Sequence, residues 1–143
     1  MFDKILVPLD GSELAEAILP HLEAVADSHQ AEVILLQVLS ATGVLPETAA
    51  KERREAKEYL MQVEQGLLEK GINARHTIRH GLDPAEEIVD YADVNNVDLI
   101  AMSTHGRSGI SRWLFGSIAS KVLQGTSKPI LLMRPPGARI SKP

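Results

Sequence analysis

The feature that most constrains the fold of this sequence is its alternation of short apolar runs with longer amphipathic segments. Five apolar runs can be counted, and segments with helical spacing of apolar residues separate them. This alternation predicts β-α-β units, in which parallel strands form a sheet covered by helices. We therefore expect an α/β fold, with an open five-stranded parallel sheet and helices on both faces. The strand order that we expect is 3-2-1-4-5. The expected strands are 4–9, 32–39, 73–80, 97–102 and 130–133.

Local start and stop signals define the helices between these strands. Ser12 predicts the cap of the first helix, and Pro20 predicts a kink within it. A long second helix is expected to start at Pro46 or Glu47 and to be ended by Gly71. Asp83, followed directly by proline, is a strong start signal for the third helix. The expected apolar stripe of the second helix comprises Ala49, Ala56, Leu60, Val63 and Leu67.

Length and residue types limit the classes of function. With 143 residues, 44% of them hydrophobic, the chain can bury one ordinary core. We expect a single domain over 1–143, with 135–143 as a loose C-terminal tail. The chain has no cysteine, which excludes disulfides, thiolate zinc sites and thiol catalysis. Because no basic leader or long apolar run is visible, we expect a cytoplasmic protein without a membrane partner.

The charge distribution favours a small anionic ligand. All 19 acidic residues lie within the first 98 positions, so the C-terminal third carries only basic charge. This asymmetry confines attraction for an anion to one end of the chain. A nucleic-acid surface would need more cations and interleaved aromatic residues, whereas aromatic residues make up only 3% of this chain. The pattern therefore favours a small phosphate-bearing ligand over a nucleic acid.

Two loops are the candidate binding elements. In an open Rossmann-like parallel sheet, ligands bind at the carboxyl ends of the strands, and the loops 8–12 and 103–117 follow the first and fourth strands. Gly106 and Gly109 allow the backbone to approach a ligand closely. Gly116 and Ser117 stand at the start of a helix, where unpaired amides could bind a phosphate. Positive charge is added by Arg107 and Arg112. The alternative is that these glycines only shape a turn.

The second loop and the run after it resemble the ATP-binding branch of the universal stress protein family. The residues are Ser103-Thr104-His105-Gly106, nine residues, Gly116-Ser117 and the run 128–133. The family pattern is glycine, two residues, glycine, nine residues, then glycine with serine or threonine. The runs 5–12 and 33–38 are similar to its first two strands, so the resemblance covers the whole chain. Ser103 departs from the pattern, since it replaces the first glycine; its side chain would either crowd a ribose or hydrogen-bond to it.

The resemblance implies an adenine-nucleotide site built from both loops. The implied ligand is ATP, with AMP, ADP or cyclic AMP as alternatives, and Mg²⁺ or Mn²⁺ would accompany the phosphates. Carried over position by position, the resemblance implies that five residues surround the adenine and the ribose: Pro8, Asp10, Val38 through its backbone, Met102 and Ser103. The resemblance implies that the residues along the phosphates are Gly106, Gly109, Gly116, Ser117 and Ile118.

Two polar side chains in these loops have alternative roles. Asp10 is the only acid in either loop, which makes it the candidate ligand for a ribose hydroxyl or a Mg²⁺ ion. Its alternative role is to accept hydrogen bonds from the turn that follows it. His105 either touches a phosphate or shapes the loop.

We expect a regulatory protein in which nucleotide occupancy changes the shape or the partners of a homodimer, with an unidentified protein as a further partner. The alternatives are a slow ATP hydrolase, for which the loops offer Asp10 and His105 but no third group to orient a base, and a dimeric adaptor without nucleotide. The dimer is expected through the fifth strand, because Ile130 to Met133 is a continuously apolar edge without protecting charges. Surface around Trp113 and Phe115 would join that interface, unless the proline-rich tail caps the edge within one monomer.

Overall fold

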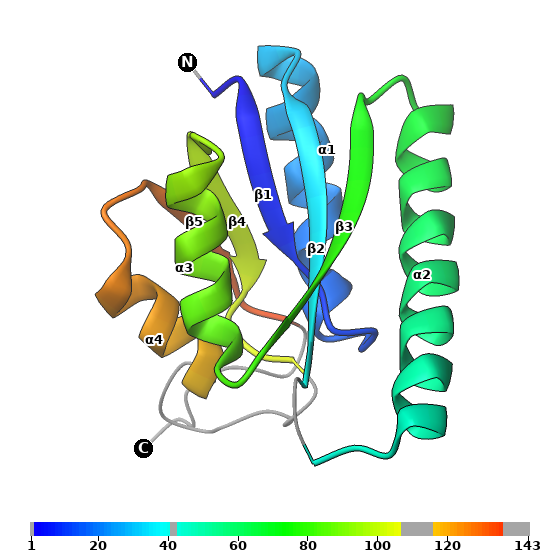
Figure 1. The fold of residues 1–143 in the computed structure, drawn as a ribbon. Helices are drawn as coiled ribbons and strands as arrows, with labels where there is room; N and C mark the ends of the chain where they lie inside the picture. Colours follow the sequence, from blue (N-terminus) through cyan, green and yellow to red (C-terminus); the bar gives the residue numbers. More distant parts are fainter. Residues whose placement is uncertain (1, 41–42, 107–115, 136–143) are drawn as a thin grey trace, which may run out of the picture.

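The computed structural model of the chain describes residues 2–40, 43–106 and 116–135. These residues form a five-stranded parallel sheet in the order β3-β2-β1-β4-β5, as the sequence predicted (Figure 1). The strands are β1 (Lys4–Pro8), β2 (Glu32–Ser40), β3 (Ala74–Gly81), β4 (Leu99–Ser103) and β5 (Ile130–Met133). The predicted tail lies outside the described residues from position 136 onward.

Helices cover both faces of the sheet, which confirms the expected layers. One face packs against the short 3-10 helix η1 (Ala15–Ile18), α1 (Leu19–His29) and α2 (Pro46–Glu69). The other face packs against α3 (Pro84–Val94) and α4 (Ser117–Gly125). Figure 1 shows α3 and α4 in front of the sheet and α1 behind it. The described helices contain no segment that is long and apolar enough to cross a membrane.

The core is built on the central strands. Ile5, Leu6 and Val7 of β1 are all 0% exposed, with Ile5 and Val7 facing α1 and α2 and Leu6 facing α3. Parallel strands that are buried on both faces need this continuous apolar sequence. The two outer strands differ, since every residue of β5 and most of β3 are only half-buried or exposed. The predicted edge positions of the third and fifth strands are therefore confirmed.

The connections of β1 and β4 leave the sheet in opposite directions. After β1 the chain runs to η1 and α1 on one face, and after β4 it returns through α4 on the other face. Since β1 and β4 are neighbours in the sheet, their carboxyl ends form the topological switch point at which open α/β sheets bind ligands. The two candidate loops begin here.

The first helical segment differs from the expectation. Instead of one helix kinked at Pro20, the chain forms η1 and then starts α1 at Leu19, with proline in the first turn. Proline has no N–H to donate to a preceding turn, and in the first turn of a helix that donor is not needed. The Ser12 hydroxyl accepts a hydrogen bond from the Ala15 amide at 3.2 Å, so Ser12 bonds to the start of η1. The N-cap positions of η1 and α1 are Leu14 and Ile18, so Ser12 is not the cap of the helix as predicted.

The apolar stripe of α2 is buried only in part. Ala56, Leu60 and Leu67 are buried, whereas Ala49 is exposed in the first turns of the helix. The side-chain spacing predicted the face of the helix correctly. It could not show how much of that face meets the sheet.

Asp83 caps α3 as predicted, and its removal gives a test of this start signal. Its carboxylate accepts a hydrogen bond from the Ala85 amide at 3.0 Å, and α3 supplies Pro84 and Ile88 to the cavity described below. We expect Asp83→Ala to lower the free energy of unfolding by about 1 kcal/mol. Asp83→Asn should keep most of the stability that the cap provides, because the side-chain amide oxygen still accepts the hydrogen bond. Urea unfolding measures both.

Asp90→Ala is the matched control, since Asp90 is exposed on the same helix and should change stability by less than about 0.5 kcal/mol. The ion pair of Asp83 with Lys121 is 3.7 Å long, and the Lys121 side chain is 62% exposed, so this pair should add little to stability. Equal stability of Asp83→Ala and Asp90→Ala would contradict the role of the cap.

Candidate functional site

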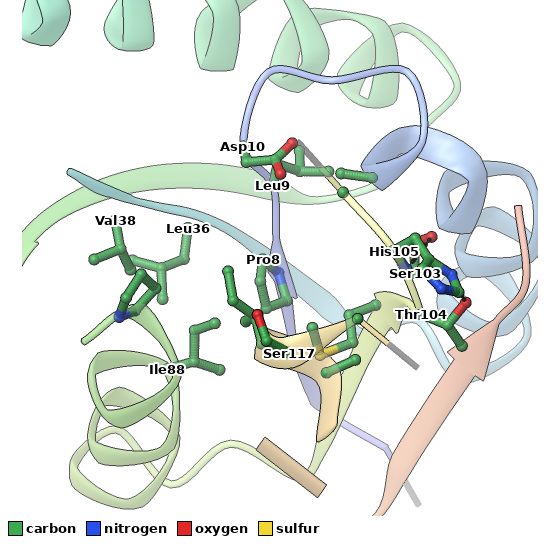
Figure 2. Close-up of a pocket in the computed structure, with 17 residues that line it drawn as sticks. Pro8, Leu9, Asp10, Leu36, Val38, Ile88, Ser103, Thr104, His105 and Ser117 are labelled. Carbon is green, nitrogen blue, oxygen red and sulfur yellow. Dashed lines mark hydrogen bonds between the residues drawn. The ribbon is translucent and has the colours of Figure 1, made fainter. Parts of the chain in front are cut away.

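A cavity of about 290 Å³ opens at the carboxyl ends of β1, β2 and β4. It lies at the switch point between β1 and β4, where the sequence placed the two binding loops (Figure 2). Of the twelve predicted site residues, Arg107 and Gly109 lie outside the described residues. The other ten all line the cavity: Pro8, Asp10, Val38, Met102, Ser103, His105, Gly106, Gly116, Ser117 and Ile118.

One side of the cavity is apolar. Leu36 and Met102 belong to the core cluster on the α3 side of the sheet, and Val38 packs against the same cluster. Figure 2 shows Pro8, Leu36, Val38 and Ile88 on this side, away from the group formed by Ser103, Thr104 and His105. A flat apolar group of a ligand could bury its faces here.

The Asp10 carboxylate is hydrogen-bonded within the first loop and lies against Gly106 of the second loop. Its Oδ1 accepts hydrogen bonds from the Ser12 amide at 3.0 Å and from the Ser12 hydroxyl at 2.6 Å. Its Oδ2 faces Gly106, where an added Cβ would overlap that oxygen. The alternative role of Asp10, as the acceptor for the turn that follows, is therefore present in the structure.

The start of α4 supplies the amides at the second loop, with one correction to the expectation. The Gly116 amide donates to the Thr104 carbonyl at 2.7 Å, so it is already used within the protein. The first bond of the helix runs from the Ser120 amide to the Gly116 carbonyl at 3.0 Å. The amides of residues 117–119 precede that bond and point out of the helix start, where the helix dipole favours an anion.

Gly116 also explains why a glycine stands at this position. A Cβ added there would lie 2.9 Å from the Thr104 carbonyl oxygen, a backbone atom that cannot swing away. The close approach of α4 to the β4 loop therefore requires a residue without a side chain.

The polar group at the end of β4 is bonded within its own loop. The Ser103 hydroxyl accepts from the His105 amide at 3.4 Å, and the Thr104 hydroxyl and His105 Nδ1 lie 2.8 Å apart. All three residues are buried. His105 lines the cavity and is also bonded within its loop, which agrees with both of its predicted roles.

The side chains at the cavity could bind a metal ion only together with the phosphate oxygens of a bound ligand. The described residues hold no group of three or more His, Cys, Asp or Glu that could bind a metal. Asp10 is a single hard carboxylate, and Mg²⁺ takes such a ligand together with phosphate oxygens and waters. Asp10 could hold Mg²⁺ beside a phosphorylated ligand, and the ion would then neutralise phosphate charge.

Several residues that line the cavity escaped the sequence analysis. Leu36 could have been found, because it lies two positions from Val38 on the same face of a strand. Pro84 and Ile88 could not, since α3 crosses back over the sheet only in the tertiary structure. Leu9 and Thr104 belong to the two predicted loops but were not named as site residues. The lining residues outside the predicted set altogether are Ala15, Leu36, Pro84, Ile88 and Ala119.

The contact between Asp10 and Gly106 predicts a sharp difference between two glycine substitutions. Gly106→Ala should lower the free energy of unfolding by about 1–3 kcal/mol, because the new methyl group would push Asp10 Oδ2 aside and disturb the two hydrogen bonds that Ser12 donates to Asp10 Oδ1. Gly66→Ala is the matched control, since Gly66 lies within α2 and nothing is within 4 Å of its added Cβ. It should stabilise the protein by up to about 1 kcal/mol. Thermal unfolding compares the two, and a neutral Gly106→Ala would contradict the contact.

Comparison with known proteins places the chain in a family. The model of the universal stress protein family matches residues 1–134. Universal stress protein MJ0531 of Methanocaldococcus jannaschii is 31% identical, with 95% of this chain and 84% of that protein covered. Universal stress protein YxiE of Bacillus subtilis is 32% identical, with 94% and 100% covered. These matches extend over nearly the whole chain.

Solved structures agree with this placement. The structure of the hypothetical protein MJ0577, also from Methanocaldococcus jannaschii, has a TM-score of 0.88 and 33% identity, with 96% of this chain and 99% of that chain covered. A family member from Archaeoglobus fulgidus in complex with dAMP has a TM-score of 0.72 at 22% identity, with 92% and 97% covered, and shares the fold. The family resemblance noted in the sequence is confirmed, and the chain belongs to the universal stress protein family.

Proposed function

We propose that this protein binds an adenine nucleotide, ATP with Mg²⁺ above all, and acts as a nucleotide-dependent regulatory protein. One observation carries the proposal: a single cavity joins an apolar side at Val38 and Ile88 to the amides at the start of α4. A purine ring would bury its faces on the apolar side, and the phosphates would lie at the helix start.

The dimensions and chemistry of the cavity support a ligand of this class. Its volume of about 290 Å³ is just below the range of ordinary small-molecule sites, which is roughly 300–1,000 Å³. AMP, ADP and cyclic AMP remain alternatives, because they share the base and the ribose with ATP. The dAMP held by the Archaeoglobus fulgidus relative belongs to that protein, and it supports the nucleotide class here without selecting ATP.

Ile118→Glu tests the phosphate end of the proposed site. Ile118 lines the cavity in the first turn of α4. A carboxylate there should repel the phosphates and weaken binding of Mg-ATP by about tenfold or more, whereas an acid in the first turn of a helix is favourable for stability. Titration calorimetry measures the affinity. AMP should lose less than ATP, because it carries fewer phosphates.

Leu123→Glu is the matched control on the same helix. Leu123 is 45% exposed and Ile118 is 37% exposed, but only Ile118 is among the residues that line the cavity. The control should bind Mg-ATP like the parent protein. Equal affinity of both variants and the parent would show that the phosphates lie elsewhere, and absence of binding by the parent protein would refute the nucleotide proposal.

The homodimer is part of this proposal. β5 lies at the edge of the sheet, and all four of its residues are only half-buried. An apolar edge of this kind leaves backbone donors and acceptors that can pair with a second copy around a two-fold axis. The predicted contribution of Trp113 and Phe115 falls outside the described residues.

Leu132→Lys should separate such a dimer, because an unpaired charge would be buried at the interface. Val94→Lys is the control, since Val94 is 69% exposed at the end of α3. Light scattering at micromolar concentration should report a dimer for the parent and the control and a monomer for Leu132→Lys. A monomeric parent protein would rule the dimer out.

Cytoplasmic location, a protein partner and at most slow ATP hydrolysis belong to the same proposal and stay predictions. The hydrolase alternative has a direct test, because steady-state turnover near the roughly 10 per second of an ordinary enzyme, abolished by Asp10→Asn, would move the protein into that class.

A further inference from the structure

Tyr59 makes a long-range hydrogen bond to Glu16, and neither residue lines the cavity. It lies on α2, half-buried against the core cluster on that face. Its hydroxyl donates a hydrogen bond to Glu16 Oε2 at 2.9 Å, across 43 positions of sequence. The contact therefore joins the long helix α2 to the short helix η1.

The helix η1 is in turn bonded to the Asp10 turn. The Ala15 amide at its start donates to the Ser12 hydroxyl at 3.2 Å, and that hydroxyl donates to Asp10 Oδ1 at 2.6 Å. Ala15 and Asp10 both line the cavity. A continuous series of contacts thus leads from the Tyr59 hydroxyl, through Glu16 and η1, to the carboxylate at the mouth of the cavity.

The electrostatics agree with this geometry. Burial raises the pKa of the Tyr59 hydroxyl strongly, and the carboxylates of Glu16 and then Asp10 raise it further. The backbone N–H of Gly11 acts in the opposite direction as a donor toward the phenol oxygen. The hydroxyl therefore stays protonated and donating, and it lies close enough to the Asp10 turn to feel both Asp10 and Gly11.

We propose that Tyr59 is a positioning residue that holds the Asp10 turn in place at the candidate nucleotide site. It acts from a helix that does not line the cavity, through Glu16 and the backbone of the turn. Without the hydroxyl, Glu16 loses its donor and η1 loses its tie to α2, so the Asp10 carboxylate is freer to move. The consequence for ligand binding rests on the proposed function, whereas the consequence for the turn does not.

The first experiment needs no ligand. Amide hydrogen exchange of Ser12, whose N–H is bonded to Asp10 Oδ1, should be about five- to tenfold faster in Tyr59→Phe than in the parent protein, as expected for the loss of one ordinary intramolecular hydrogen bond. Tyr91→Phe is the matched control, since Tyr91 is the other tyrosine of the chain and is buried on α3 on the opposite face. Unchanged Ser12 exchange in Tyr59→Phe would overturn the proposal.

Glu16 offers the same test from the other end of the bond. Glu16→Ala removes the acceptor and should accelerate Ser12 exchange as Tyr59→Phe does. Glu16→Gln keeps an acceptor oxygen and should restore protection. If Tyr59→Phe fails to fold, this pair decides, and equal exchange in Glu16→Ala and Glu16→Gln would overturn the proposal.

The second experiment separates positioning from a general loss of structure. We expect Tyr59→Phe to weaken Mg-ATP binding severalfold, and to have no further effect once Asp10→Ala has removed the group that it positions. Additive effects in this double-mutant cycle would overturn the positioning role. If the parent protein binds no Mg-ATP, the proposed function fails, and the exchange of Ser12 still decides whether Tyr59 holds the turn.

Discussion

The structure depends on the burial of β1 on both of its faces. Ile5, Leu6 and Val7 are wholly inaccessible to solvent, and β2 and β4 flank them on either side. A strand of this kind must be covered from both directions, so consecutive crossovers cannot all lie on one face. The connections of β1 and β4 therefore diverge, and their divergence opens a cavity at the carboxyl ends of the strands. The candidate site is a consequence of how the core is covered.

The cavity combines an apolar and a polar environment, because strand ends line one part of it and the start of a helix lines another. The strands contribute apolar side chains such as Leu36 and Met102, which continue the core outward. The helix α4 contributes amides that its own hydrogen bonding leaves over. Apolar surface and amide donors suit opposite ends of one amphipathic ligand, which is why the arrangement favours a nucleotide over a purely apolar or a purely ionic molecule.

The two loops lie close together where Asp10 meets Gly106, and a side chain at Gly106 would prevent this approach. Asp10 reaches the space in which Gly106 would carry a Cβ, and the same carboxylate accepts two bonds from Ser12. The carboxylate is therefore a structural group of the turn as well as a candidate for ligand contact. Tyr59 extends this arrangement to α2, so the geometry of the site depends on a helix outside it.

Local patterns in the sequence determined the strands and the start of α3 at Asp83, because burial on two faces and helix caps leave such patterns. The positions expected for the site residues came from the two glycine-bearing loops and from the family resemblance. Only the tertiary structure decided where Pro84 and Ile88 fall, since the path of α3 over the sheet leaves no local signal. It also decided that the Gly116 amide binds Thr104 instead of facing the cavity. Ala49 could not be told from Ala56 by spacing, and the extent of the sheet beneath α2 exposed one and buried the other. Local patterns record which face of an element is apolar, whereas the contacts that the face makes depend on segments distant in sequence.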